Sequence, residues 1–239
     1  MPEGPYSHET PLSLFRKLFL NSGLYHALYK ASEYLGGETW GDNIEANTNF
    51  VQSIPEEIRH KPIFRMLLLG SATSTSIKQA LEALSQWENK GFISYGKLTV
   101  IDVNPAAFLQ LDPETRKKVD LIQGDVTKVP FAPSSFDFIS SDYLLNFIPR
   151  NELESTISSL SELLVSGGVM TAALDTKKAV ITNKLGSFFV RNGITAADVD
   201  STVNKDTATL LAHLPAISKG LGKINNVGSD RLVWAVQKK

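Results

Sequence analysis

The chain of 239 residues contains no cysteine. Disulfide bonds, thiolate catalysis, and zinc or iron–sulfur sites with cysteine ligands are therefore excluded. Histidine is also scarce, and the four histidines form no i,i+4 pair that could place two metal ligands on one helix face. We therefore expect no metal site.

Neither sign of charge is in excess, because 24 Lys and Arg residues face 25 Asp and Glu residues for a net charge of -1. Bulk attraction to nucleic acid or to anionic lipid is missing, so neither is expected as a partner. No apolar run approaches the roughly 20 residues that span a membrane, and no basic region precedes an apolar stretch near Met1. We expect a soluble, cytoplasmic protein, and the sequence sets no oligomeric state.

What the chain does contain is ample apolar material, at 42% hydrophobic residues, arranged in alternating strand and helix patterns. Short apolar runs predict strands at 64–69, 97–103, 119–123, 136–140 and 168–174. Apolar residues at three- and four-residue steps predict helices at 76–89, 105–111 and 151–165. Such alternation is typical of a mainly parallel sheet covered by helices on both faces.

The two ends of the chain follow other patterns. Residues 11–35 have the apolar stripe of amphipathic helices, and a short helix is expected at 47–54. Residues 222–227 and 232–237 flank a Gly-Ser-Asp turn and predict an antiparallel hairpin. The hairpin would bring the sheet to seven strands.

Ligands of open parallel sheets bind beyond the carboxyl ends of the strands, so the residues that follow each strand are the candidates for a site. Small and hydroxylated residues, beginning with Gly70, follow the first strand. Asp102 ends the second strand, Asp125 follows the third, and Ser141 and Asp142 follow the fourth.

Each of these residues also has a structural interpretation. Gly70 and Ser74 could form a tight turn with a helix cap, and Asp102 could be solvated or cap a helix that begins at Pro105. Asp125 could be an ordinary turn residue, and Asp142 could be a helix cap.

Two longer stretches carry a resemblance to a known family. Residues 124–137 combine a post-strand Gly-Asp, a Pro-Phe pair and a Phe-Asp strand opening, and residues 163–168 read Leu-Leu-Val-Ser-Gly-Gly before the fifth strand. These motifs resemble those of the class I S-adenosylmethionine-dependent methyltransferases. The resemblance implies an α/β, Rossmann-like three-layer sandwich with a mainly parallel seven-stranded sheet. Its domain would span 62–239, with a helical N-terminal extension or lid at 1–61 and a helical insertion at 176–221.

The resemblance also assigns roles to single residues around an S-adenosyl-L-methionine cofactor. The methionine part would lie on Gly70, Ser71 and Ala72, and the Ser141 backbone would face its ammonium group. The remaining cofactor-binding residues would be Asp102 at the ribose hydroxyls, Val103 against the adenine, Asp125 at the adenine amino group, and Val126 through its backbone N–H.

The acceptor is expected to be a small molecule, methylated by in-line displacement. Asp142, Tyr143 and Asn146 follow the fourth strand and are the candidates for acceptor contact and catalysis. Tyr25, His26 and Tyr29 form a second group, whose structural interpretation is the packing face of an amphipathic helix; residues 176–221 are a candidate acceptor region.

The first motif departs from the family pattern and keeps a second interpretation open. Leu68 stands where the family has an acidic residue, and Ala72 and Ser74 stand in place of two glycines. A non-catalytic or repurposed methyltransferase fold that acts as a binding or partner subunit is therefore the alternative. A nicotinamide-dependent reductase is a third candidate, but the chain lacks Gly-x-Gly-x-x-Gly and Tyr-x-x-x-Lys.

Overall fold

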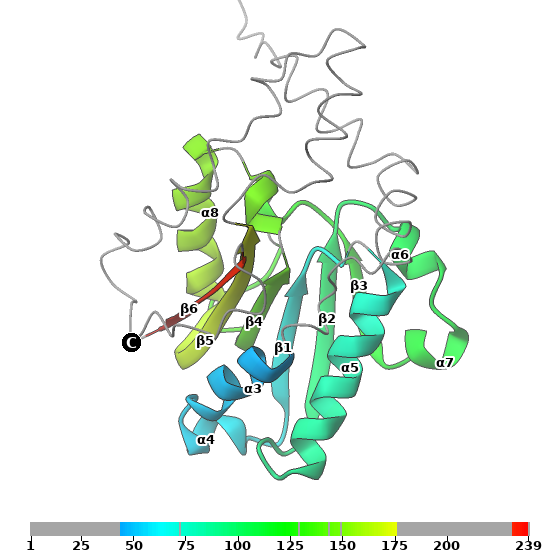
Figure 1. The fold of residues 1–239 in the computed structure, drawn as a ribbon, viewed down its shortest axis with the longest axis vertical. Coiled ribbons are helices and arrows are strands. Elements are labelled where there is room, and N and C mark those ends of the chain that lie inside the picture. The colour runs from blue at the N-terminus through cyan, green and yellow to red at the C-terminus, as the bar shows by residue number, and fades with distance from the viewer. Residues whose placement is uncertain are drawn as a thin grey trace, which may run out of the picture.

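The computed structural model describes residues 44–71, 73–128, 130–142, 144–148, 150–175 and 231–238. Figure 1 shows a central sheet with helices packed on it. The helices are α3 (Ile44–Gln52), α4 (Glu56–Arg59), α5 (Ser74–Asn89), α6 (Ala106–Leu109), α7 (Pro113–Arg116) and α8 (Arg150–Leu163), with short 3-10 turns η2 (Val126–Lys128) and η3 (Leu144–Phe147). The strands are β1 (Phe64–Leu69), β2 (Gly96–Asp102), β3 (Val119–Gln123), β4 (Phe136–Asp142), β5 (Leu164–Asp175) and β6 (Arg231–Gln237).

The sheet has the order β3-β2-β1-β4-β5-β6. Its first five strands are parallel, and β6 runs antiparallel to β5. The chain order reverses between β1 and β4, which is the position where open parallel sheets bind ligands. The arrangement therefore places the expected site at the carboxyl ends of β1, β2 and β4.

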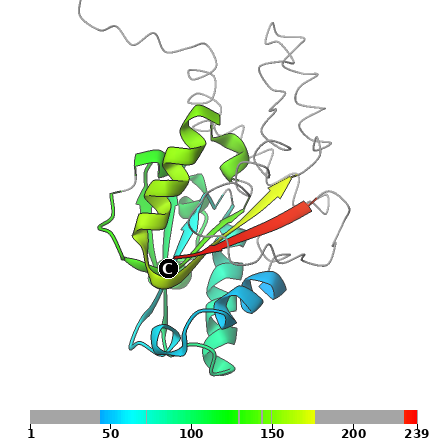
Figure 2. The ribbon, with the colours of Figure 1, turned by 90° about the vertical axis from the view of Figure 1, so that its left-hand side faces the viewer.

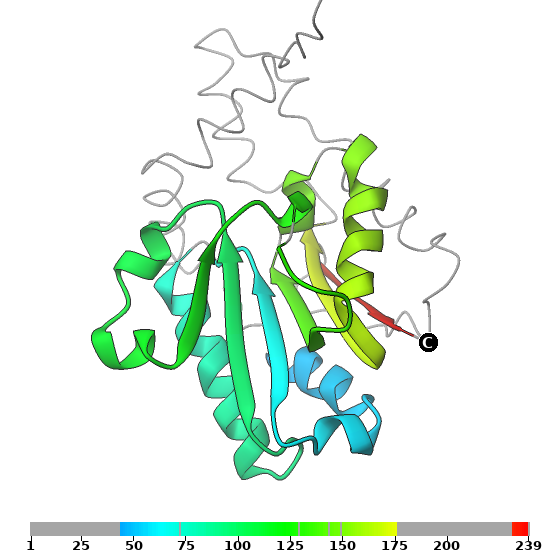
Figure 3. The same ribbon diagram turned by 180° about the vertical axis from the view of Figure 1, so that it is seen from behind.

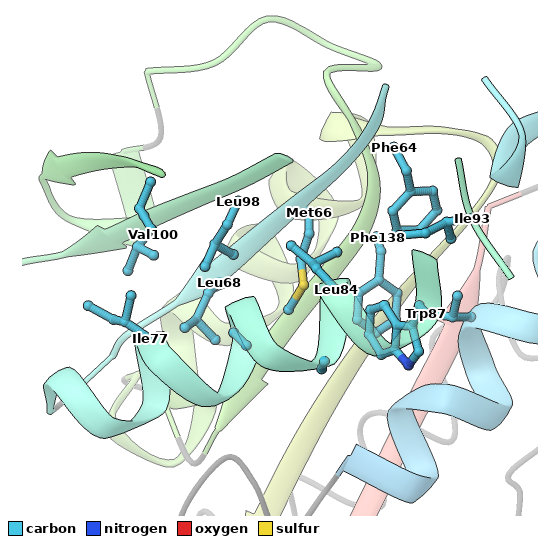
Figure 4. Packing of buried hydrophobic residues seen from close by; sticks show 14 of the residues in the cluster. Phe64, Met66, Leu68, Ile77, Leu84, Trp87, Ile93, Leu98, Val100 and Phe138 are labelled. Carbon is cyan, nitrogen blue, oxygen red and sulfur yellow. The ribbon is translucent and has the colours of Figure 1, made fainter. Parts of the chain in front are cut away.

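One face of the sheet is covered by α3, α4 and α5. Ile77, Ala80, Leu84 and Trp87 recur at three- and four-residue steps along α5 and are all buried, which explains why this segment is helical and how it packs. Figure 4 shows the α5 side chains against Met66 and Leu68 of β1. The Trp87 ring meets Phe138 of β4 edge to face, with centroids 5.9 Å apart.

The opposite face of the sheet packs against α8 and η3. Leu67 and Leu69 alternate with Met66 and Leu68 along β1, so both faces of this strand are apolar, as in parallel sheets buried on both sides. Figures 2 and 3 show α8 on the face of the sheet opposite to α3 and α5. The predicted three-layer α/β architecture is confirmed.

A buried carboxylate joins elements at the amino end of the sheet. Asp137 of β4 is fully buried and accepts hydrogen bonds from the Arg65 backbone N–H at 2.8 Å and from Lys61 Nζ at 3.1 Å. The Arg65 side chain lies 3.6 Å away. The carboxylate thus fixes the start of β1 beside β4, away from the expected site.

Several details of the sequence-based prediction need correction. The sheet in the described part of the chain has six strands instead of seven, and the other arm of the expected hairpin, residues 222–227, lies outside that part. The helix expected at 105–111 is shorter in the structure, where α6 covers only Ala106–Leu109, and a second short helix, α7, follows after residues 110–112. The fifth strand begins at Leu164 rather than Gly168, because Leu164 already pairs with Phe136 before the register shifts.

Some expected features fall outside the described residues, among them the helices at 11–35 and the insertion at 176–221. The domain boundary expected at residue 61 stays a prediction. No helix in the described ranges combines the length and apolar character that crossing a membrane requires.

Candidate functional site

Three strand ends meet at the reversal point of the sheet. Leu69, the last residue of β1, pairs with Ile101 on one side and Ser141 on the other. The ends of these strands therefore share one edge, which brings together Gly70 just after β1, Asp102 as the last residue of β2, and Ser141 near the end of β4. These three come from separate segments of the sequence, and the fold joins them as the motifs predict.

Gly70 begins the loop that leaves β1, and its backbone requires glycine. Its φ is +68°, in the left-handed region that side chains with a Cβ disfavour. A Cβ at this position would also lie 3.2 Å from Leu144 Cδ1 of η3. The Gly70 N–H donates to the Ile101 carbonyl at 2.9 Å, which ties the loop to the end of β2.

The loop from β1 to α5 is short and partly buried. Thr73, not Ser74, is the N-cap residue of α5, and the Thr73 N–H donates to the Ser71 carbonyl. Ser71 and Thr73 are both buried. Ala72, which the sequence places with them, lies outside the described residues.

Asp102 is the polar centre of this edge. Its Oδ2 accepts the Ser71 N–H at 2.8 Å and the Ser71 hydroxyl at 3.3 Å, while its Oδ1 accepts the Asn104 N–H at 2.8 Å. Its side chain is not solvated, because the residue is only 7% exposed. It does not cap the following helix either, because Asn104 Oδ1 accepts the Ala106 N–H at the start of α6. Asp102 therefore fixes the two loops that frame the site.

The residues after β2 and β3 lie farther along the same edge. Val103 is half-buried, and its carbonyl accepts a hydrogen bond from the Gln123 side chain at 3.3 Å. The exposed Asp125 accepts the Thr127 N–H at 2.9 Å and its hydroxyl at 2.8 Å, as a turn residue does. The side chain of Val126 is buried in the hydrophobic core.

Ser141 carries the one buried side-chain N or O atom in the described part of the chain that has no hydrogen-bond partner, its Oγ. The residue is 3% exposed and lies between Leu69 and Ala172 in the sheet register. An unsatisfied buried hydroxyl costs about 1–3 kcal/mol, so native proteins retain one where a ligand, water or ion supplies the partner. The side chain therefore marks a polar contact point at the end of β4.

The candidates for acceptor contact lie next to Ser141 in the chain. Asp142 is the last residue of β4 and Asn146 belongs to η3, so their backbones follow the reversal point directly. Tyr143, together with Tyr25, His26 and Tyr29, lies outside the described residues.

A buried polar chain behind this edge was not predicted from the sequence. The Thr171 hydroxyl of β5 contacts Asn47 Oδ1 of α3 at 2.9 Å and the Ser140 hydroxyl of β4 at 3.2 Å, and all three side chains are buried. The only sign of this contact in the sequence is an Asn in a helix, and its partner Thr171 lies 124 residues later in the chain. These hydrogen bonds hold α3 close to β5 and to β4, the strand that carries Ser141.

Comparison with known proteins finds a family match in the centre of the chain. Residues 81–168 match the family model of a methyltransferase domain. This match confirms the resemblance that the motifs predict, and it covers Asp102, Asp125 and Ser141 but begins after the Gly70 loop. No curated protein matches the chain in sequence.

Solved structures with the same fold are numerous but distant in sequence. A Rhodobacter sphaeroides protein assigned as a Zn-dependent alcohol dehydrogenase has a TM-score of 0.53 and 16% identity, over 80% of this chain and 90% of that one. The N-methyltransferase NodS from Bradyrhizobium japonicum WM9, in complex with S-adenosyl-L-homocysteine, has a TM-score of 0.47 and 17% identity over 81% and 86%. CalS10, an amino pentose methyltransferase from Micromonospora echinaspora with S-adenosylmethionine bound, has a TM-score of 0.45 and 19% identity over 61% and 55%. The first of these structures shows a likeness of fold alone, because its identity is only 16%.

Proposed function

We propose that this chain, in which residues 81–168 match a methyltransferase domain, transfers a methyl group from S-adenosylmethionine to a small-molecule acceptor. The structural observation that carries the proposal is the convergence of Gly70, Asp102 and the unpartnered Ser141 hydroxyl at the reversal point of the sheet. This is the edge where a doubly wound sheet binds a nucleotide-like ligand.

The residues fit a ligand that has both an adenosine and an amino-acid part. Gly70 permits the left-handed turn that begins the loop after β1, and Ser141 Oγ offers a buried hydroxyl in need of a partner. Asp102 is a carboxylate that can accept hydrogen bonds from ribose hydroxyls, and Asp125 is an exposed carboxylate that can accept from an amino group. The adenine would pack on Val103.

The bound S-adenosylmethionine would supply an electrophilic methyl group on a positively charged sulfur. The role of the chain is then to bind both partners and to orient the acceptor atom in line with that methyl, since alignment alone can supply much of the rate. A general base is required only for an acceptor that is protonated at neutral pH. Asp142, Tyr143 and Asn146 are the residues proposed for acceptor contact, and of these only Asp142 and Tyr143 have side chains that can exchange a proton.

The nature of the acceptor is part of the proposal. The net charge of -1 favours a small molecule over nucleic acid or a membrane surface. Residues 176–221 are rich in Thr, Ala and Leu, which suits a partly apolar substrate. The cytoplasm remains the expected location.

A second candidate function has an observation in its favour. Asp102 already accepts three hydrogen bonds from the loops beside it, and Leu68, Ala72 and Ser74 replace the usual residues of the first motif. Both features suit a methyltransferase fold that has lost its cofactor and acts as a partner subunit. A nicotinamide-dependent reductase is the weaker alternative, because the sequence contains neither the Gly-x-Gly-x-x-Gly fingerprint nor Tyr-x-x-x-Lys.

Calorimetric titration with S-adenosylmethionine and S-adenosylhomocysteine separates these functions, with NADH as the control ligand. We expect saturable binding of both methionine derivatives and none of NADH. Ser141→Ala should weaken binding without lowering stability, because it removes a hydroxyl that has no partner in the free protein. No detectable binding at millimolar concentration would exclude the enzyme and favour the partner subunit.

A further inference from the structure

The first turn of α3 is held on the sheet by a polar residue. Asn47 is only 1% exposed, although asparagine is mostly found at protein surfaces. Its Oδ1 accepts the Thr171 hydroxyl of β5 at 2.9 Å, and the same hydroxyl lies 3.2 Å from the Ser140 hydroxyl of β4. Thr171 and Ser140 are buried as well. The three side chains therefore link α3, β5 and β4 where bulk water cannot compete for their hydrogen bonds.

This polar link lies near the carboxyl ends of two strands. Ala46, the residue before Asn47, packs against Ala173 of β5. Ala173 in turn pairs with Asp142, the last residue of β4. The first turn of α3 thus faces the carboxyl-terminal part of β5, beside the end of β4.

Ser140 and Ser141 are consecutive residues of β4, so their side chains point to opposite faces of the sheet. Ser140 points toward α3 and contacts Thr171, whereas the buried Ser141 hydroxyl has no partner. The pairing of β4 with β1 ends at Ser141, while its pairing with β5 continues to Asp142. The polar link therefore anchors β4 one residue before the unpartnered hydroxyl, at the point where the strand leaves β1.

We propose that Asn47 and Thr171 are positioning residues, which hold the end of β4 so that the Ser141 hydroxyl meets the ligand. This inference rests on the proposed function, since it requires S-adenosylmethionine or its product at this edge. A buried polar pair fixes the place of a helix more strictly than apolar contacts do, because any slide of the helix leaves the amide oxygen unsatisfied. Loss of the pair should therefore weaken ligand binding through Ser141.

A double-mutant cycle measures this coupling to Ser141. Calorimetry gives the dissociation constants of S-adenosylhomocysteine for the wild type, for Asn47→Leu combined with Thr171→Val, for Ser141→Ala, and for the triple variant. Replacing both members of a hydrogen-bonded pair by apolar groups of the same shape can leave stability nearly unchanged. Urea unfolding checks that each variant is folded, and Thr171→Val alone repeats the comparison with the smallest change.

Two controls separate positioning from a general loosening of α3. Thr171→Ser keeps the hydroxyl of the polar link. Thr48→Val changes the next residue of α3, whose hydroxyl accepts the Trp87 Nε1–H of α5 at 2.9 Å and so joins α3 to a different element.

We expect the apolar pair to bind S-adenosylhomocysteine about threefold to tenfold more weakly than the wild type, and less than about twofold more weakly when Ser141 is already alanine. Both controls should bind as the wild type does. If the wild type binds, equal affinity of the apolar pair, or the same loss in the Ser141→Ala background, would overturn the positioning role and leave the proposed function intact. Absence of binding by every protein, the wild type included, would overturn both.

Discussion

Asp102 is the residue whose replacement affects the structure and the proposed site together. Its two carboxylate oxygens accept the backbone N–H groups of Ser71 and Asn104, each at 2.8 Å, in a buried environment. Asp102→Ala leaves both N–H groups without these acceptors. A buried donor that loses its partner costs about 1–3 kcal/mol, so we expect a loss of about 2–5 kcal/mol in the free energy of unfolding.

Asp102→Asn gives a finer test of the same reasoning. The amide oxygen can still accept one of the two N–H groups, but the amide nitrogen faces the other as a second donor. We therefore expect about half the loss seen for Asp102→Ala. Asp125→Ala is the matched control, because this carboxylate at the next strand end is exposed and its loss should cost less than about 1 kcal/mol.

Urea unfolding followed by tryptophan fluorescence, to which the buried Trp87 contributes, measures these differences. The same variants are then titrated with S-adenosylhomocysteine. We expect Asp102→Ala to bind this ligand more than about tenfold more weakly than the wild type, because a charge-assisted hydrogen bond is lost. A stability loss below about 0.5 kcal/mol would refute the structural role of Asp102. An unchanged affinity would refute the ribose assignment.

Three further predictions concern other parts of the chain. Gly70→Ala should lower the free energy of unfolding by about 1–2 kcal/mol, because alanine disfavours the left-handed φ of +68°, and it should abolish ligand binding. Thermal unfolding measures the first effect and calorimetry the second. A variant as stable as the wild type would contradict the loop geometry. Asp137→Ala should cost about 2–3 kcal/mol in urea unfolding because the Arg65 N–H loses its buried acceptor, and a cost under about 1 kcal/mol would contradict that role. Hydrogen bonds from the Thr115 N–H and hydroxyl lower the pKa of Asp112 from 3.8 to about 2. Because the folded-state pKa is lowered, the stabilising contribution of Asp112 is present above pH 3.8 and is lost as the pH falls toward 2. NMR titration should show Thr115→Val raising this pKa only partway, since the backbone bond remains, and an unaltered pKa would exclude the hydroxyl as a cause.

The buried strands are the part of the fold most readily predicted from the sequence. The bounds of β1 and β3 agree with the apolar runs at 64–69 and 119–123. For β1 the reason is its burial on both faces, which calls for a nearly continuous apolar run. The carboxyl ends of parallel strands share an edge, so the positions of Gly70, Asp102 and Ser141 directly at strand ends are enough to group these residues.

The remaining features depend on contacts between distant residues. The bond from the Ser71 N–H to Asp102 joins residues 31 positions apart, and neither residue type indicates that bond. The contact of Asn47 with Thr171 spans 124 positions, and an Asn in a helix is more often exposed than buried. The early start of β5 follows from the pairing of Leu164 with Phe136, which hydrophobic periodicity does not encode.

A crystal structure with S-adenosylhomocysteine soaked in tests the central claim most directly. The account predicts density across the carboxyl ends of β1 and β2, with the ribose hydroxyls on Asp102 and a polar ligand atom within hydrogen-bond distance of Ser141 Oγ. Density elsewhere, or a soaked crystal in which no ligand lies over Gly70, would contradict it.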